Sequence, residues 1–142
     1  DASNITYDFT DSILNTYYFE TALDLRPTIV STDPSFGQTD VSTNSTISIT
    51  FNENIFLGTS GEIVIQDMSA SSVFDSISIS DEVDSSNQLS GMGTSTLIIT
   101  PSTTFTSDVS YSVLIDPLAL QDACGEFFAG IVDDTYYNFT VL

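Results

Sequence analysis

Thr46-Ile47-Ser48-Ile49-Thr50-Phe51 is the stretch that decides the fold class of this chain. Its apolar residues alternate with polar ones, so successive side chains point to opposite faces, as in a half-buried β-strand. Segments of the same type follow at Glu62 to Gln66 and at 111–115, and residues that favour turns separate them. No amphipathic segment of helical length interrupts the series. The sequence therefore predicts an all-β protein.

The rows of inward-facing residues extend this prediction to two packed sheets. Their spacing is typical of an immunoglobulin-like antiparallel β-sandwich of about seven strands with Greek-key connections. We expect Leu118 to Ala123 to form one short helical turn and Asp81 to Gly93 to form an exposed loop. The predicted inward residues are Ile47, Ile49, Phe51, Ile63, Ile65, Val73, Ile77, Ile79, Leu97, Ile99, Tyr111, Val113, Ile115, Tyr137, Phe139 and Val141.

Composition limits the chain to one domain and excludes several classes of partner. A chain of 142 residues with 41% hydrophobic content is long enough to bury one core. The formal net charge of -19, from 20 carboxylates and the single cation Arg26, would repel nucleic acids and anionic membranes. No apolar run approaches the roughly 20 residues that cross a bilayer. We therefore expect neither a nucleic-acid partner nor a membrane span.

The residues before the sandwich form an N-terminal arm, so the predicted organisation is an arm at 1–26 and a sandwich at 27–142. The arm contains neither glycine nor proline, and Ile5-Thr6-Tyr7-Asp8-Phe9 alternates like a strand. Such an apolar segment needs a partner, which is either its own sandwich or the open sheet edge of a neighbouring subunit. The residues expected to make these contacts are Ile5, Tyr7, Phe9, Tyr17 and Phe19.

One segment of the arm recurs at the end of the chain. Asn15-Thr16-Tyr17-Tyr18-Phe19-Glu20-Thr21-Ala22 is similar to Asp134-Thr135-Tyr136-Tyr137-Asn138-Phe139-Thr140-Val141. The first copy is therefore either the last strand of a preceding repeat or a strand that this subunit lends to a neighbour. Both interpretations predict a protein whose copies join end to end.

The side chains that most catalytic mechanisms need are missing from the sequence. The chain has no His and no Lys, and its one cysteine, Cys124, has small neighbours that favour a buried thiol. Carboxylates such as Glu53, Asp122 and Glu126 could form a pair for glycoside hydrolysis, but residues of this type are expected in turns for structural reasons. We therefore predict that the protein is not an enzyme and requires no cofactor.

Clustered loop carboxylates favour calcium binding over glycoside hydrolysis, because the calcium ion takes six to eight oxygen ligands. None of the acidic clusters has the spacing of an EF-hand loop, and a solvated acidic loop is the alternative for each of them. The preferred candidate for an optional calcium site is the cluster of Asp116, Asp122, Glu126, Asp133 and Asp134 near the end of the chain.

Several segments of the sandwich resemble a known family when they are taken in order. They are Pro27-Thr28-Ile29-Val30-Ser31, Ile49-Thr50-Phe51-Asn52-Glu53-Asn54-Ile55, Leu97-Ile98-Ile99-Thr100-Pro101, Tyr111-Ser112-Val113, Leu120-Gln121-Asp122-Ala123-Cys124-Gly125-Glu126-Phe127-Phe128-Ala129-Gly130 and Tyr137 to Val141. From about Pro27 to Leu142 the chain is similar to bacterial Ig-like domains of SwmB type, which recur in large secreted and surface proteins. The resemblance implies an immunoglobulin-like sandwich and an extracellular or cell-surface location.

Two functions are compatible with these features. The preferred hypothesis is a structural subunit of an extracellular, pilus-like surface filament, in which the arm joins copies of the chain by strand addition. The alternative is one Ig-like module of a tandem-repeat surface adhesin, with calcium stiffening the joints and glycans among its ligands. Three sequons, at Asn4, Asn44 and Asn138, would accept glycans in either setting.

Overall fold

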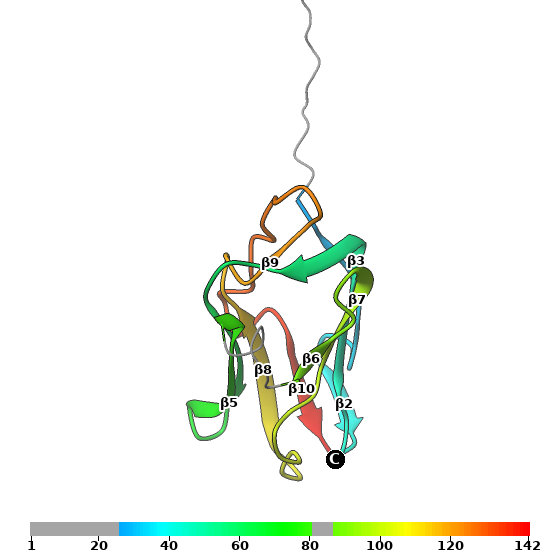
Figure 1. Cartoon of the computed structure of the whole chain (residues 1–142). Helices are drawn as coiled ribbons and strands as arrows, with labels where there is room; N and C mark the ends of the chain where they lie inside the picture. The colour runs from blue at the N-terminus through cyan, green and yellow to red at the C-terminus, as the bar shows by residue number, and fades with distance from the viewer. Residues whose placement is uncertain (1–25, 81–86) are drawn as a thin grey trace, which may run out of the picture.

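Ten β-strands make up the regular structure of the computed structural model, which describes residues 26–80 and 87–142 (Figure 1). The prediction of an all-β sandwich is confirmed, although the strands outnumber the roughly seven expected. The strands are β1 (Ile29–Asp33), β2 (Gln38–Val41), β3 (Ile47–Leu57), β4 (Glu62–Asp67), β5 (Ser72–Ser78), β6 (Leu89–Ser90), β7 (Thr94–Ile99), β8 (Ser110–Ile115), β9 (Leu120–Gln121) and β10 (Asn138–Val141).

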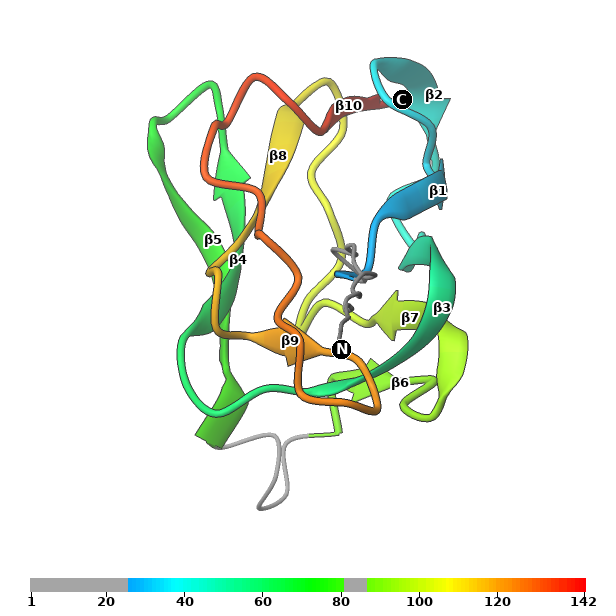
Figure 2. The same ribbon diagram turned by 90° about the horizontal axis from the view of Figure 1, so that it is seen from above.

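The strands form two sheets that face each other, as the view along the sandwich in Figure 2 shows. One sheet has the order β1-β3-β7-β6, with β9 paired to β3 beyond that path, and the other has the order β2-β10-β8-β4-β5. Neighbouring strands are antiparallel except β2 and β10, which run parallel. The parallel pair departs from the fully antiparallel sandwich that the sequence predicts.

The core lies between the sheets and contains the predicted inward residues, with one exception. Every member of that set is buried apart from Val73, which is 62% exposed. A bulge in β5 explains the difference: Ile65 is opposite Asp75 and Gln66 is opposite Val73, so Phe74 is the extra residue. Phe74 packs on Phe105, with ring centroids 5.3 Å apart, while Val73 faces out.

An aromatic cluster around Tyr111 fills one end of the core. Its ring lies 4.8 Å from Phe74, 4.7 Å from Phe105 and 6.1 Å from Phe139. Its hydroxyl accepts a hydrogen bond of 3.0 Å from the backbone N–H of Thr106. Tyr111 therefore joins β5, β8, β10 and the segment before β8 in one contact.

Short strands account for the remaining differences from the predicted elements. Leu118 to Ala123 contains β9 instead of a helical turn, because Gln121 pairs with Phe56 of β3 and Leu120 is fully buried. The predicted loop from Asp81 to Gly93 contains β6, in which Leu89 pairs with Ile99. β2 lies beside β10 in a region where no strand was expected. These strands have only two to four residues, too few to show alternation.

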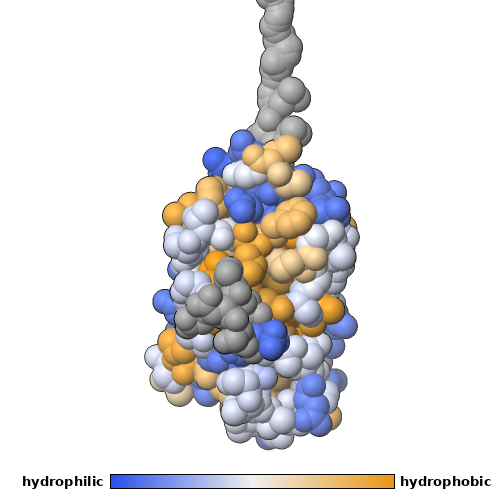
Figure 3. All heavy atoms as spheres, in the orientation of Figure 1, coloured by the Kyte–Doolittle hydropathy of each residue, from blue (hydrophilic) through white to orange (hydrophobic). Residues whose placement is uncertain are grey.

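The described part of the chain enters and leaves at opposite ends of the sandwich. In Figure 1, the blue segment that leads into β1 lies at one end, and the C terminus, marked C after β10, lies at the other. Figure 3 shows the same face: apolar side chains gather in its middle, and hydrophilic or neutral side chains cover most of the end near the C terminus. Within 26–80 and 87–142, no helix has the length and apolarity needed to cross a membrane. Residues 1–25, which include the predicted arm contacts and Asn4, lie outside the described residues.

Candidate functional site

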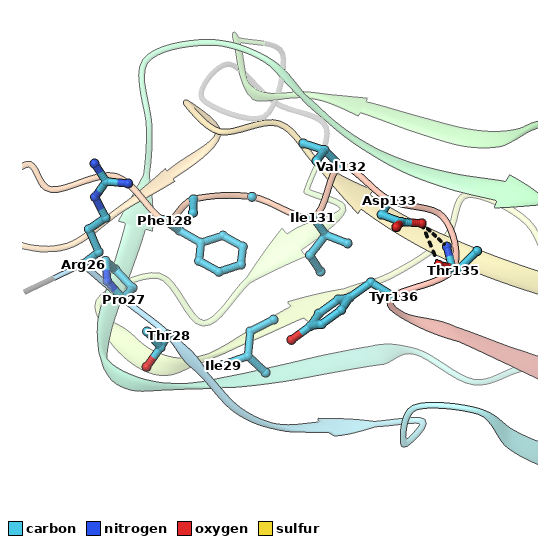
Figure 4. A pocket seen from close by; sticks show the side chains of 12 residues that line it. Arg26, Pro27, Thr28, Ile29, Phe128, Ile131, Val132, Asp133, Thr135 and Tyr136 are labelled. Atoms are coloured by element: carbon cyan, nitrogen blue, oxygen red, sulfur yellow. Dashed lines mark hydrogen bonds between the residues drawn. The ribbon is translucent and has the colours of Figure 1, made fainter.

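An apolar groove of about 760 Å³ lies beside the point where the chain enters the sandwich. One wall is the chain leading into β1, and the other is the segment 128–136 before β10 (Figure 4). In the figure, Arg26 and Pro27 lie at one end of the groove and Tyr136 at the other. The large apolar residues of the lining are Pro27, Ile29, Phe128, Ile131, Val132 and Tyr136.

The groove has a buried floor and an exposed rim. Phe128 and Ile131 are only 6% and 3% exposed, and the Phe128 ring meets Phe51 edge-on with 5.1 Å between centroids. Val132 and Tyr136, in contrast, are 76% and 53% exposed. Several large apolar side chains around a concavity are typical of a contact site rather than of ordinary surface.

Hydrogen bonds to two strands fix the wall formed by residues 128–136. The N–H of Phe128 donates to the carbonyl of Leu120, and Ile131 and Ile115 exchange two bonds of 2.8 and 2.9 Å. At the far end, Asp133 Oδ1 accepts bonds from the N–H and the hydroxyl of Thr135, at 2.8 and 2.7 Å. Both bonds lower the pKa of Asp133 below its ordinary value, and the bond from the Thr135 hydroxyl has the larger effect. The wall is therefore attached to the sandwich at Phe128 and Ile131, and its far end is held by a local turn.

Apolar surface continues from the groove along the edge of the first sheet. β1 ends the sheet order and pairs only with β3 among the described strands. Val30 of β1 is 64% exposed, and nearby Phe36 is 47% exposed. The Phe36 ring lies 5.2 Å from that of Tyr136, which connects this edge to the groove rim. An unpaired, partly apolar edge strand can accept a further strand.

The groove was not predicted from the sequence, although one signal for it exists. Phe127-Phe128-Ala129-Gly130-Ile131-Val132 is an uninterrupted run of apolar or small residues between Glu126 and Asp133. Such a run has no alternation to identify it as a strand. The run indicates a contact surface only once the structure shows that Ile29 lies across the groove from it.

The structure distributes the predicted calcium ligands over three turns, which contain Asp116, the pair Asp122 and Glu126, and the pair Asp133 and Asp134. Asp116 Oδ2 accepts a bond of 2.9 Å from the N–H of Glu62. Asp122 is 5% exposed, and its Oδ1 accepts bonds of 2.8 Å from the N–H groups of Cys124 and Glu126. Glu126 and Asp134 are exposed, as is Asp133 in its Thr135 turn.

The five carboxylates are therefore not brought together as one ligand set. Among residues 26–80 and 87–142, no group of three or more His, Cys, Asp or Glu side chains is arranged to hold a metal ion. Asp116, Asp122 and Asp133 instead accept hydrogen bonds from backbone N–H groups, as expected of Asp in turns. Calcium binding stays a prediction for this chain.

Glu53 is a half-buried carboxylate on β3. Desolvation raises its pKa above the ordinary 4.5, and the negative charge of Asp122 adds to the effect. These are two of the carboxylates considered for glycoside hydrolysis. Asp122, however, has one oxygen committed to two backbone N–H groups, so it shapes the turn that carries it.

Replacing Glu53 with glutamine should stabilise the protein at neutral pH and have little effect near pH 3. A raised pKa in the folded state means that the stability contribution of Glu53 is present below its unfolded pKa and is lost as the pH rises through its folded pKa. Glutamine removes the charge that the fold disfavours. Thermal unfolding of both proteins at pH 3 and pH 7 measures the difference, with Glu126→Gln as the exposed control. A wild-type protein that is more stable than the variant at pH 7 would contradict this assignment.

Cys124 and two of the sequons are placed by the structure. The thiol is exposed, so the prediction of a buried cysteine was wrong; the Asp122 turn carries Cys124 at the surface. Asn44 is exposed, whereas Asn138 is half-buried in β10 and its Nδ2 donates to the carbonyl of Thr135 at 3.1 Å. Glycosylation at these positions stays a prediction.

Comparison with known proteins identifies the family of this chain. CopC from Methylosinus trichosporium OB3b is similar in structure, with a TM-score of 0.51 and 13% identity, over 81% of this chain and 92% of that chain. The S-layer protein rSbsC(31-844) has a TM-score of 0.48 and 17% identity, over 82% of this chain and 14% of that chain. No curated protein sequence matched. The sequence model of the bacterial Ig-like domain matches residues 24–141, so this chain belongs to the bacterial Ig-like domain family.

Proposed function

We propose that the chain carries one module of a tandem array in a bacterial surface or extracellular protein, with a spacing and contact role. Domains of this family are typically structural modules of such proteins. The observation that carries the proposal is the spacing of the repeated segment. Thr16 and Thr135 each begin a Thr-Tyr-Tyr sequence and are 119 residues apart, and the family match, 24–141, is 118 residues long.

The place of the second copy in the fold supports this interpretation. Tyr137, the second tyrosine of that copy, is fully buried and its hydroxyl donates to the carbonyl of Pro34 at 2.7 Å. It leads directly into β10, the last strand of the sandwich. The first copy, at 15–22, lies one module length earlier, where the last strand of a preceding module would be.

The positions of the two chain ends also support the tandem arrangement. Arg26 and Leu142 lie at opposite ends of the sandwich (Figure 1), so modules joined in sequence would extend in line. Only residues 24–26 would separate the end of one module from the Pro27 that opens the next. A linker of that length favours neighbouring modules in contact. No catalytic role is included in the proposal.

The edge of β1 favours a second candidate function, the strand-linked filament. Ile5-Thr6-Tyr7-Asp8-Phe9 of one copy could add to the unpaired edge of β1 in another, with Val30 and Phe36 contacting its side chains. Such a contact is heterologous, so it would produce an open polymer. The tandem proposal requires no association between separate chains.

A protein in which Leu142 is followed by a second copy of residues 24–142 tests the tandem function. This junction reproduces the natural spacing of 119 residues. We expect small-angle X-ray scattering to show two sandwiches in line, at a molecular mass independent of concentration. The matched control has a flexible Gly-Ser linker inserted after Leu142 and should give a broader distribution of lengths. Scattering indistinguishable from the control would overturn the proposal, and a mass that grows with concentration would favour the filament.

A further inference from the structure

We propose that the parallel pair of β2 and β10 is a mechanical clamp, which lets the sandwich resist tension applied between its two ends. A role of this clamp in carrying tension along an array of modules rests on the proposed tandem function. The clamp itself does not, because both of its strands belong to one sandwich.

Tension reaches the two strands of the clamp from opposite directions. The chain enters the sandwich at one end, and in Figure 1 β10 points toward the C terminus at the other. β2 lies beside β10 in Figures 1 and 2 and runs the same way, because the pair is parallel. A pull on the entering chain therefore acts on β2 at its first residue, Gln38, whereas a pull on Leu142 acts on β10 at its last. The two strands are loaded in shear, along their axes.

β1 is the strand that this tension meets first. It pairs with β3 in an antiparallel ladder whose register shifts between Ile29 and Ser31. A bulge of this kind locally disrupts the hydrogen bonds between two strands. If β1 leaves its sheet, the load passes to β2 and β10, which stay joined. The clamp therefore decides the force at which the sandwich as a whole opens.

Hydrogen bonds join the clamp at both of its ends. The N–H of Gly37 donates to the carbonyl of Asn138 at 2.7 Å, and the N–H of Leu142 donates to the carbonyl of Val41 at 2.8 Å. These bonds run from strand to strand, so a force along the strands loads them together. A force that peels the strands apart from one end would instead break them one after another.

The core protects the clamp and adds a side-chain link to it. Val41 and Val141 are only 3% and 1% exposed, so the core side of the pair is closed to water. Tyr137, just before β10, is fully buried, and its hydroxyl donates to the carbonyl of Pro34, ahead of β2, at 2.7 Å. A hydrogen bond in such surroundings is electrostatically stronger than one in water.

Single-molecule force spectroscopy of the intact 142-residue chain, held at its two ends, tests the clamp, because rupture under force reports the rate of unfolding. A second arrangement uses a protein with Cys124→Ser and Ser42→Cys, held by its one thiol and by the C terminus. Position 42 is exposed and directly follows β2, so this arrangement peels β2 and β10 apart from one end. The peeling force should be at least about twofold lower than the end-to-end force, because the bonds no longer share the load.

Two variants that each lose one buried hydroxyl give a matched comparison. Tyr137→Phe removes the link to Pro34 and should lower the end-to-end rupture force. Tyr111→Phe removes an acceptor for the N–H of Thr106, which is only five residues away along the chain. That bond does not join the two strands of the clamp, so Tyr111→Phe should leave the rupture force unchanged.

The outcomes separate the clamp from the proposed tandem function. Equal rupture forces in the two pulling arrangements, or equal effects of Tyr137→Phe and Tyr111→Phe, would overturn the clamp. This holds even if the tandem protein described above scatters as two sandwiches in line, which would leave the tandem function standing. If the peeling force is the lower one but the tandem protein behaves like its flexible control, the clamp stands and the proposed tandem function fails.

Discussion

Tyr111→Ala is expected to lower the free energy of unfolding by about 3 to 5 kcal/mol, which is a large part of the stability of a small domain. The ring is fully buried and lies within 4.8 Å of Phe74 and 4.7 Å of Phe105, measured between centroids. These neighbours come from separate segments, Phe74 from β5 and Phe105 from the segment before β8, and a cavity that its surroundings fill only partly adds to the cost. Urea denaturation followed by circular dichroism measures the loss, provided that the unfolding is two-state.

Two further variants separate packing from hydrogen bonding at this position. Tyr111→Phe keeps the ring and removes only the acceptor for the N–H of Thr106, so we expect a loss of about 1 kcal/mol. Tyr136→Ala removes the same atoms from a side chain that is 53% exposed and should cost less than Tyr111→Ala. Equal losses for Tyr111→Ala and Tyr136→Ala would show that the aromatic cluster does not stabilise the sandwich as described.

The long strands could be predicted from the sequence because burial on one face leaves a period of two. Tyr111, Val113 and Ile115 show that period, and all three are buried in β8. The same rule failed at Val73, since the bulge at Phe74 reverses which residues face inward and nothing in the local sequence marks it. β9 was missed for a different reason: a strand of two residues is defined by its partner in β3, not by its own pattern.

The groove could not be predicted because its walls are distant in sequence. Ile29 and Tyr136 become neighbours only when β1 and the segment before β10 take their places in opposite sheets. The acidic residues, in contrast, make contacts that are local in sequence. Asp122 stands out as a carboxylate near others, but the N–H groups that occupy it belong to Cys124 and Glu126, only two and four residues away. An Asp followed three residues later by Gly125 is a turn signal that the sequence already contains.

Gly130→Ala is expected to destabilise the protein by about 2 to 5 kcal/mol and to distort the groove. Gly130 has a φ of +89°, and a Cβ there would lie 2.5 Å from the carbonyl oxygen of Ile115. The backbone must therefore shift where Ile131 and Ile115 exchange their two hydrogen bonds. Because Gly130 lies between Phe128 and Val132, that shift would move the floor of the groove relative to its rim.

Gly125→Ala is the matched control for this prediction. Its φ is +88°, almost the same as that of Gly130, but a Cβ at Gly125 would meet no atom within 4 Å. It should therefore cost only the roughly 1 to 2 kcal/mol of placing alanine at positive φ. Urea denaturation compares the two, and the resonances of Val132 and Tyr136 report on the groove. Equal losses would mean that Ile115 does not confine Gly130, whereas a larger loss at Gly130 with shifted Val132 and Tyr136 resonances would show that the strand β8 holds the groove in shape.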